Sequence, residues 1–441
     1  GLGHLSLNRA VSSLSGGERQ RVTLAGQLST HLFGVTYVLD EPTIGLDAEQ
    51  VAALSEALKQ IVANGNTVVV VEHDPSFIKN ADYLIEMGPA AGRLGGEVMF
   101  QGKVSDIAKA PHTVTYQLLQ EPPVRLAQPK REKGLLFGLR GANANNLKNV
   151  DLDLYSGQLI AVTGVSGSGK SSLVKDVLYS SWLKNRAVHC QSTFGLDQFE
   201  ELHLMDQEPI SQSRLSTLAS FTGILDLLKA VFSKTDLARQ EGIKRADFSY
   251  QSKAGKCSAC SGHGQLKTSM DFMSDVWLTC DSCKGLRYSD AVLACKYQGR
   301  SIGEVLQMTV EEAIGFFGSG AHVDSLEVLQ KVGVGHVLLG QSTATLSGGE
   351  SQRLKLARTL LHTSSGSGAG KTAAGRLYLF DEPSTGLHYF DILQLITVFQ
   401  TIVDQGDTVL FIEHNATLIE VADQVLRLGP GSGDSGGMLM S

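Results

Sequence analysis

The chain has 441 residues, of which 42% are hydrophobic and 19% charged, a composition typical of a globular protein with roughly three domains. Its formal net charge of −7 gives no overall electrostatic case for nucleic-acid binding, so any such site has to be a local basic patch. No apolar run approaches the ~20 residues that span a membrane, and the first residues carry no signal-peptide pattern. We therefore expect a cytoplasmic protein without a membrane-spanning segment.

A series of three short motifs occurs twice in the chain. The first series is Leu14-Ser15-Gly16-Gly17-Glu18, Tyr37-Val38-Leu39-Asp40-Glu41-Pro42 and Val71-Glu72-His73. The second is Leu346-Ser347-Gly348-Gly349-Glu350, Tyr378-Leu379-Phe380-Asp381-Glu382-Pro383 and Ile412-Glu413-His414. Because chance does not keep three motifs in order, the repeat predicts two related halves. The second series carries an extra Gly/Ser-rich stretch, 364–372, which we interpret as a surface loop.

The apolar runs near these motifs are short and largely β-branched. They comprise Val68 to Val71, Leu159 to Val162, Leu377 to Phe380 and Val409 to Ile412. Such runs are typical of buried parallel strands flanked by helices, so the expected fold class is α/β.

A glycine-rich segment follows the second of these runs. Gly164-Val165-Ser166-Gly167-Ser168-Gly169-Lys170-Ser171 fits the pattern G-x-x-x-x-G-K-[ST], and an amphipathic run begins at Ser172. Its glycines, at 164, 167 and 169, allow backbone N–H groups to cradle phosphates, with Ser166 and Ser172 in the same loop and helix start. Lys170 would reach the β- and γ-phosphates and Ser171 would ligate Mg²⁺. A similar segment, Gly366 to Thr372, precedes a strand instead of following one, and we interpret it as a decoy.

Four further residues complete the expected nucleotide site. Asp381 would hold Mg²⁺ through water, and Glu382 would polarise the attacking water as a general base. His414, at the end of the next strand, would contact the γ-phosphate, although a lone His in such a place is more often a packing residue. Gln207, after the apolar stretch Leu202 to Met205, would sense Mg²⁺ and the attacking water.

Two C-x-x-C pairs lie between the phosphate loop and the second motif series. Cys257 and Cys260 are separated from Cys280 and Cys283 by a spacing that predicts a closed tetrahedral four-cysteine zinc site with a structural role. His263 is a weaker alternative ligand. Cys190 and Cys295 are interpreted as buried thiols.

Basic and aromatic residues surround the zinc module. The basic ones are Lys244, Arg245, Lys253, Lys256, Lys267, Lys284 and Arg287, and the aromatic ones are Phe248, Tyr250, Phe272, Trp277 and Tyr288. This pattern favours a surface that follows nucleic-acid phosphates. The alternative is a solvated surface around a small hydrophobic core.

The motif Leu-Ser-Gly-Gly-Glu is similar to the signature of ABC ATPases. In that family it closes over a nucleotide held by the opposite head, which implies that Ser15, Gly16 and Gly17 would cap the loop from Gly164 to Ser171. The resemblance implies ABC-type P-loop ATPase heads with an inserted helical signature region and a four-cysteine zinc module. The expected parts are residues 1–120 (the C-terminal part of a first head), 121–134 (linker), 135–190 (phosphate-loop part of a second head), 191–345 (inserted region, with the zinc module at 253–290) and 346–441 (the rest of the second head).

A zinc module between phosphate loop and signature resembles UvrA, the damage-sensing subunit of the bacterial excision nuclease. The segments that carry the resemblance include Gly1 to Leu5, Asp40 to Leu46, Asn146 to Val150, Val162 to Ser171 and Asp206 to Ile210. The resemblance covers the whole chain, as the C-terminal part of a longer protein. It implies an ATPase with ATP, Mg²⁺ and Zn²⁺ as cofactors that dimerises, binds damaged double-stranded DNA and loads a UvrB-like helicase subunit without cutting DNA.

Three features depart from the family pattern. Gln212 and Leu215 stand where arginines are usual, Asp47 stands where His is common, and the loop 364–372 is extra. A UvrA-like paralogue that gives resistance to DNA-binding drugs therefore stays open as an alternative. Two others are the ATPase subunit of a transporter and a zinc-bearing adaptor, because Cys257 to Gly264 also resembles chaperone zinc centres.

Overall fold

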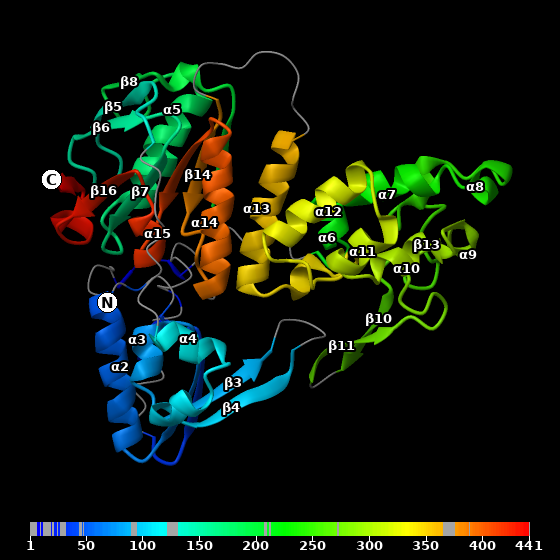
Figure 1. Cartoon of the computed structure of the whole chain (residues 1–441), viewed down its shortest axis with the longest axis horizontal. Coiled ribbons are helices and arrows are strands. Elements are labelled where there is room, and N and C mark those ends of the chain that lie inside the picture. Colours follow the sequence, from blue (N-terminus) through cyan, green and yellow to red (C-terminus); the bar gives the residue numbers. More distant parts are fainter. Residues whose placement is uncertain are drawn as a thin grey trace. The chain divides into compact units, whose positions relative to one another are not determined.

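The computed structural model describes residues 7–8, 10–11, 19, 22–23, 25–26, 32–43, 46, 48–89, 95–120, 131–206, 210, 213–270, 273–364, 375–387 and 389–440. The chain forms two compact units, unit 1 with residues 1–207 and 369–441 and unit 2 with residues 208–368 (Figure 1). No helix in the described part of the chain is long and apolar enough to cross a membrane.

The N-terminal part of unit 1 contains the strands and helices of the first motif series. They are β1 (Thr36–Asp40), α2 (Ala48–Ala63), β2 (Thr67–Val71), α3 (Pro75–Lys79), β3 (Tyr83–Gly88), β4 (Glu97–Lys103), η3 (Val104–Lys109) and α4 (Val114–Gln120). Strands β1 and β2 pair in parallel, and β3 and β4 pair antiparallel.

The rest of unit 1 is built on a six-stranded sheet with the order β17-β16-β7-β15-β14-β9. Its strands are β7 (Leu159–Gly164), β9 (Leu202–Met205), β14 (Leu377–Asp381), β15 (Thr408–Ile412), β16 (Gln424–Gly429) and β17 (Met438–Met440). All neighbours are parallel except β16 and β17. The parallel pairing brings the ends of β7, β14 and β15 to one edge of the sheet, where ligands bind in α/β folds.

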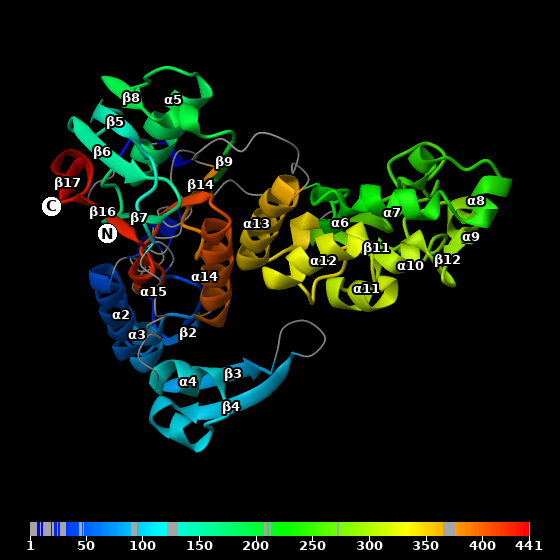
Figure 2. The same ribbon diagram turned by 45° about the horizontal axis from the view of Figure 1, so that its top comes forward.

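A smaller antiparallel sheet and several helices complete this part. They are β5 (Leu136–Ala142), β6 (Val150–Tyr155), η4 (Ser172–Tyr179), α5 (Ser180–Leu183), β8 (Ser192–Phe194), η5 (Leu196–Gln198), α14 (Tyr389–Asp404), α15 (Ala416–Glu420) and η8 (Gly433–Ser435). Helix η4 has π-type turns, and its apolar side chains, among them Leu173 and Leu178, are fully buried in the main core. Helix α14 runs beside the large sheet, where it contacts β15 and β7 (Figures 1 and 2).

Unit 2 is mostly helical. Its elements are α6 (Leu218–Phe221), α7 (Ile224–Phe232), α8 (Asp236–Gln240), η6 (Arg245–Phe248), β10 (Gln265–Met270), β11 (Met273–Thr279), α9 (Asp290–Ala294), β12 (Lys296–Tyr297), β13 (Arg300–Ser301), α10 (Ile302–Leu306), α11 (Val310–Phe317), α12 (Ala321–Lys331), η7 (Thr343–Thr345) and α13 (Gly348–Ser364). Reciprocal capping boxes start α10, with Ser301 and Glu304, and α11, with Thr309 and Glu312. Strands β10 and β11 form an antiparallel hairpin.

The expectation of buried parallel strands is met for three of the four apolar runs. Every residue of β14 and β15 is buried, and β7 is buried over its first four residues. Strand β2 is parallel as expected, but Val69 and Val71 are 48% and 50% exposed. The reason is that β2 pairs with β1 alone among the described strands, whereas its counterpart β15 lies between β7 and β14.

Candidate nucleotide site and zinc centre

The phosphate loop connects β7 to η4, and two of its glycines have no room for a side chain. Gly164 has φ +144°, and a Cβ there would lie 2.1 Å from the carbonyl oxygen of Leu428. Gly169 has φ +102°, and a Cβ would lie 2.9 Å from Oδ1 of Asn146. The glycine pattern is therefore required by positive φ and by close backbone approach.

The loop is anchored through its carbonyl oxygens. The oxygen of Gly167 accepts hydrogen bonds from Asn146 Nδ2 and from the Gly433 amide, each at 3.0 Å. The oxygen of Ser168 accepts from the Gly437 amide at 3.1 Å. A loop held in this way keeps its shape without a ligand, as a preformed phosphate cradle requires.

The side chains inside the loop fit an anion. Lys170 is only 6% exposed, and its Nζ donates to the carbonyl oxygens of Gly164 at 2.8 Å and Val165 at 3.0 Å. Phosphate oxygens would be stronger acceptors for this ammonium group than two carbonyl groups. The Ser168 hydroxyl is buried and has no hydrogen-bond partner among the described residues, and such a group is unusual outside functional sites. Ser166 lies half-buried in the same loop, and the Ser172 hydroxyl accepts from Asn145 Nδ2 at 2.8 Å.

Ser171 and Asp381 form a fitting pair of magnesium ligands. The Ser171 hydroxyl lies 3.5 Å from each carboxylate oxygen of Asp381, which is 6% exposed at the end of β14. Burial raises the pKa of Asp381, although the charges of Lys175 and Lys170 and the Ser171 hydroxyl act in the opposite direction. A desolvated carboxylate beside a hydroxyl suits Mg²⁺, which prefers oxygen ligands and would neutralise the phosphate charge.

Glu382 and His414 lie just beyond the ends of the neighbouring strands β14 and β15. Glu382 has φ +49°, a conformation that is rare for a non-glycine residue and that is often found at functional sites. Its amide donates to the Ile412 carbonyl at 3.0 Å, and its Oε1 lies 3.7 Å from His414 Nε2. A carboxylate held in this way beside an imidazole can take a proton from an attacking water.

Glu413 accepts hydrogen bonds from the backbone amides that follow β14 and β15. Its role was not predicted from the sequence. It is 2% exposed, its Oε1 accepts from the Ser384 amide at 2.8 Å, and its Oε2 accepts from the amides of His414 at 2.8 Å and Asn415 at 3.0 Å. Burial raises the pKa of Glu413, while these hydrogen bonds act to lower it. The sequence feature that could have indicated this role is the repeat of the Glu-His pair, as Glu72-His73 and Glu413-His414.

The first motif series has the same local geometry. Glu41 has φ +44°, and its Oε1 lies 3.2 Å from His73 Nε2. Glu72 accepts from the amides of Thr43 at 2.9 Å and His73 at 2.8 Å, as Glu413 does in the second series. The hydrogen bond that Glu41 accepts from His73 raises the pKa of His73 against the effect of burial. The repeat therefore extends from sequence motifs to side-chain contacts.

Some expected site residues lie outside the described residues. They are Gln207, the first signature with Ser15, Gly16 and Gly17, and the decoy loop Gly366 to Thr372.

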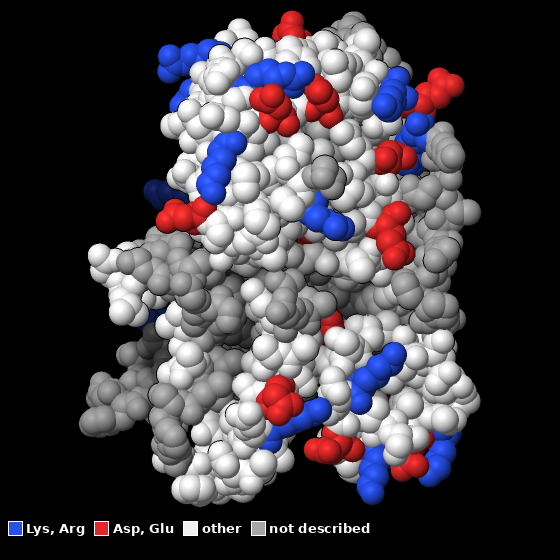
Figure 3. Space-filling view, turned by 90° about the vertical axis from the view of Figure 1, so that its left-hand side faces the viewer, with Lys and Arg blue, Asp and Glu red and all other residues white. Residues whose placement is uncertain are grey.

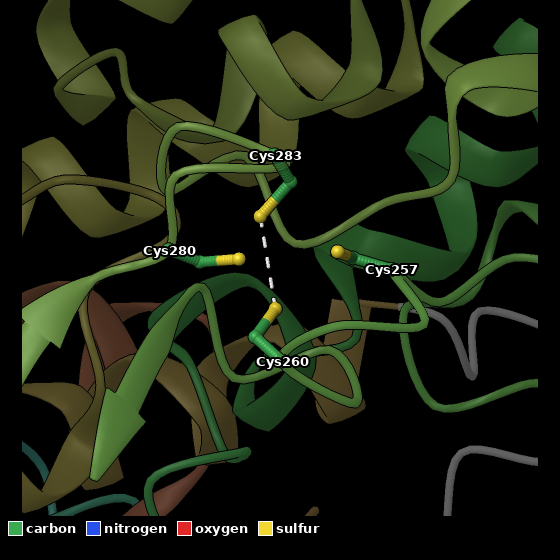
Figure 4. Close-up of side chains that lie close together, drawn as sticks. All are labelled: Cys257, Cys260, Cys280 and Cys283. Carbon is green, nitrogen blue, oxygen red and sulfur yellow. Dashed lines mark hydrogen bonds between the residues drawn. The ribbon is translucent and has the colours of Figure 1, made fainter. Parts of the chain in front are cut away.

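The four cysteines of the two C-x-x-C pairs converge in unit 2 (Figure 4). Their Sγ atoms all lie within 4.8 Å of one another, and those of Cys260 and Cys283 are 3.6 Å apart. All four side chains are buried, and the set found in the described residues does not include His263. This spacing fits the edges of a tetrahedron with Zn–S bonds of about 2.3 Å.

Backbone geometry supports thiolates at this centre. The Gly264 amide donates to Cys260 Sγ at 3.2 Å, and Gly262 has φ +83°, where a Cβ would lie 1.9 Å from the Tyr250 carbonyl oxygen. Burial acts to raise the pKa of Cys257, yet the amides of Cys260 and Ala259 lower it to about 7. Burial raises the pKa of Cys283 to about 12. Four converging buried sulfur atoms form a donor set that a zinc ion would bind and deprotonate. Of the other thiols, Cys295 is buried as expected and Cys190 is half-buried.

The structure divides the basic and aromatic residues around the centre into two groups. Phe248, Tyr250 and Tyr288 are completely buried, and Arg287 is 9% exposed, with its guanidinium over the Tyr250 ring and donating to the Gly262 carbonyl. Their assignment to a binding surface was wrong, because they form the core that supports the zinc module. The side chains that remain exposed are Lys244, Arg245, Lys253, Lys267 and Lys284, while Lys256 and Trp277 are half-buried and Phe272 lies outside the described residues.

The parallel sheet with its phosphate loop, the Asp381-Glu382 pair, the following His414 and the signature helix α13 define the class of protein. They are the parts of an ABC-type ATPase head, here with an inserted helical unit that contains a four-cysteine centre. A model of archaeal ribosome-bound Pelota and ABCE1 covers 98% of the chain and 56% of its own length at a TM-score of 0.54 and 18% identity, which supports the fold alone.

Two other comparisons are much closer. The chain is 43% identical to UvrABC system protein A of Thermus thermophilus, over 100% of this chain and 46% of the relative. The crystal structure of UvrA2 from Deinococcus radiodurans matches 100% of this chain and 53% of its own, with a TM-score of 0.92 and 39% identity. No family model matches the chain. The chain belongs to the UvrA family, and it spans about half the length of the curated relatives it matches.

Proposed function

We propose that this chain is the ATP-hydrolysing and DNA-binding part of a UvrA-type subunit that recognises DNA damage in nucleotide excision repair. The observation that carries the proposal is the combination, in one chain, of a phosphate loop, the paired Glu382 and His414, and a four-cysteine centre followed by a hairpin that exposes Lys267. The chain would correspond to the C-terminal part of the longer relatives, with the domain boundaries expected from the sequence.

In the ATP reaction, Lys170 and the loop amides would hold the phosphates, and Ser171 and Asp381 would hold Mg²⁺. Glu382 would take the proton of the attacking water, with His414 fixing its carboxylate and contacting the γ-phosphate. Gln207 would sense the metal and the water. Ser15, Gly16 and Gly17 would close the site from the other head. The magnesium ion supplies charge neutralisation at the transferred phosphate when it is bound.

The zinc module would present DNA-binding side chains rather than take part in the ATP reaction. Support comes from the β10–β11 hairpin, which follows the first cysteine pair and exposes Lys267 on one strand, with Trp277 at the paired position on the other. The Arg214 guanidinium lies 4.3 Å from the Trp277 ring centroid, so a second basic side chain reaches this hairpin. Acidic and basic side chains are interspersed on the face of the molecule drawn in Figure 3.

The proposed partners follow from the family to which the chain belongs. They are damaged double-stranded DNA, a second copy of the protein in a homodimer, and a UvrB-like helicase subunit that the protein loads. Cutting of the DNA would be left to other subunits.

A role in resistance to DNA-binding drugs is the second candidate. It is favoured by the altered segment around Arg214, where Leu215 stands in place of a usual arginine. The backbone carbonyl oxygen of Leu215 accepts a hydrogen bond from the Tyr250 hydroxyl at 3.0 Å. Affinity for duplexes that carry a drug adduct, compared with duplexes that carry other bulky lesions, separates the two roles.

The experiment that tests the DNA surface is a salt titration of duplex binding by the Lys267→Gln variant. Each phosphate contact that is lost should lower the slope of log K against log salt by about 1. The matched control is Lys331→Gln, an exposed lysine at the end of α12 in the same unit. An unchanged slope in Lys267→Gln, or an equal change in the control, would contradict the proposed surface.

A further inference from the structure

Lys175 lies beside the proposed magnesium site, although it belongs to none of the motifs that define that site. It comes from the first turns of η4, one turn after Ser171. Its Nζ lies 3.9 Å from Oδ2 of Asp206, and the two side chains are 30% and 26% exposed. The pair is thus partly withdrawn from water, where a charge interaction is screened less than on an open surface.

Asp206 is a structural neighbour of Asp381. It follows Met205, the last residue of β9, and Met205 pairs with Phe380, the residue before Asp381, in the parallel register of β9 and β14. Asp206 and Asp381 therefore follow neighbouring ends of adjacent parallel strands, and Lys175 of η4 faces Asp206.

Two neighbouring carboxylates with a serine hydroxyl are enough oxygen ligands to attract a divalent cation without any nucleotide. A cation bound in this way would occupy the site before the phosphates arrive. The charge of Lys175 offsets the charge of one of these two carboxylates.

We infer that Lys175 is a positioning residue of the nucleotide site that holds Asp206 and keeps the nucleotide-free site from taking up a divalent cation alone. The inference rests on the proposed function, because it concerns the same site. With Lys175 in place, a divalent cation would bind tightly only when the nucleotide is present. The phosphate oxygens then supply further ligands and negative charge beside Ser171 and Asp381.

The test is Mn²⁺ binding to the nucleotide-free protein, measured by the electron paramagnetic resonance signal of free Mn²⁺. Lys175→Met should bind Mn²⁺ about 3- to 10-fold more tightly than the wild type, as expected for removal of a partly screened unit charge near the site. Lys175→Arg should restore the wild-type affinity because it keeps the charge. The matched control is Lys184→Met, an exposed lysine at the end of α5.

A second variant keeps the inference testable even if Lys175→Met folds poorly. Asp206→Asn removes one carboxylate and leaves the lysine charge near Asp381, so its Mn²⁺ affinity should fall below that of the wild type. Equal Mn²⁺ affinity in folded Lys175→Met and wild type, or tighter binding by Asp206→Asn, would overturn the inference. Titration of the same wild-type sample with Mg·ATP reports separately on the proposed function, which fails if no Mg·ATP binds.

Discussion

The first turn of the signature helix α13 depends on a three-residue hydrogen-bond set. The Glu350 carboxylate accepts from the Ser347 amide at 2.9 Å and contacts His336 Nε2 at 3.0 Å, and the Ser347 hydroxyl accepts from the Glu350 amide at 3.2 Å. This is a capping box with a histidine added to it. Because the Ser347 hydroxyl oxygen accepts this bond, its proton stays available for another acceptor.

The energy of this set can be worked out from the titration of Glu350. Its pKa is lowered from 4.5 to about 2, chiefly by the hydrogen bond with His336. A shift of this size corresponds to about 3 kcal/mol at full strength. Because the His336 and Glu350 side chains are 23% and 17% exposed, we expect about 1–2 kcal/mol after solvent screening. A lowered pKa means that this stabilisation is present above pH 4.5 and is lost as the pH falls towards 2.

The perturbation is Glu350→Gln, which removes the charge at every pH. The assay is urea unfolding in a Trp182→Phe background, because Trp277 then remains as the only tryptophan and reports on unit 2. The variant should be less stable than its background by about 1–2 kcal/mol at pH 7, and by about half of that near pH 3. His336→Ala should cost a similar amount, and the double variant should show a coupling of about 1 kcal/mol.

The matched control is His203→Ala, which breaks a comparable pair with Glu201, at 3.1 Å, in unit 1. It should leave the Trp277 transition unchanged. A destabilisation by Glu350→Gln that is the same at pH 7 and pH 3, or additive effects of the two single changes, would refute the reasoning.

Three other predictions concern the site itself. Lys170→Ala should reduce ATP turnover by about 10²-fold or more at saturating magnesium, while the zinc content stays at the wild-type value. Turnover at the wild-type rate would show that Lys170 does not bind the phosphates. Glu382→Gln should slow ATP hydrolysis by about 10²- to 10⁴-fold, so that the nucleotide recovered from the protein is ATP. Rapid conversion of the bound ATP to ADP would exclude Glu382 as the general base. Cys257→Ser should release zinc and weaken DNA binding with ATP turnover less affected, and full zinc retention by metal analysis would contradict the four-cysteine centre.

The sequence predicted those parts of the site that depend on fixed local spacing. The phosphate loop, the strand-terminal Asp381 and the four cysteines are of this kind, because each motif needs particular residues close together along the chain. Glu382 and His414 were also placed from their positions at strand ends, and the parallel sheet brings them within 3.7 Å.

Other features depend on which elements pack together, and the sequence could not supply that. Arg287 and Tyr250 have the composition of a binding surface, yet they are buried because the zinc module needs a core of its own. Lys175 and Asp206 are adjacent because η4 packs beside β9, and Asp206 lies next to Asp381 through the register of β9 with β14. The exposure of Val69 in β2 similarly follows from the pairing of strands and not from the apolar run itself.

The central claim is that one chain couples ATP binding to the recognition of damaged DNA. The most direct measurement is the affinity of the purified protein for fluorescent duplexes with and without one bulky lesion, at a fixed salt concentration, with and without ATP. The account predicts a preference for the damaged duplex that changes when ATP is added and that no longer changes in Lys170→Ala. Equal affinity for both duplexes, or a preference that ATP does not alter, would contradict it.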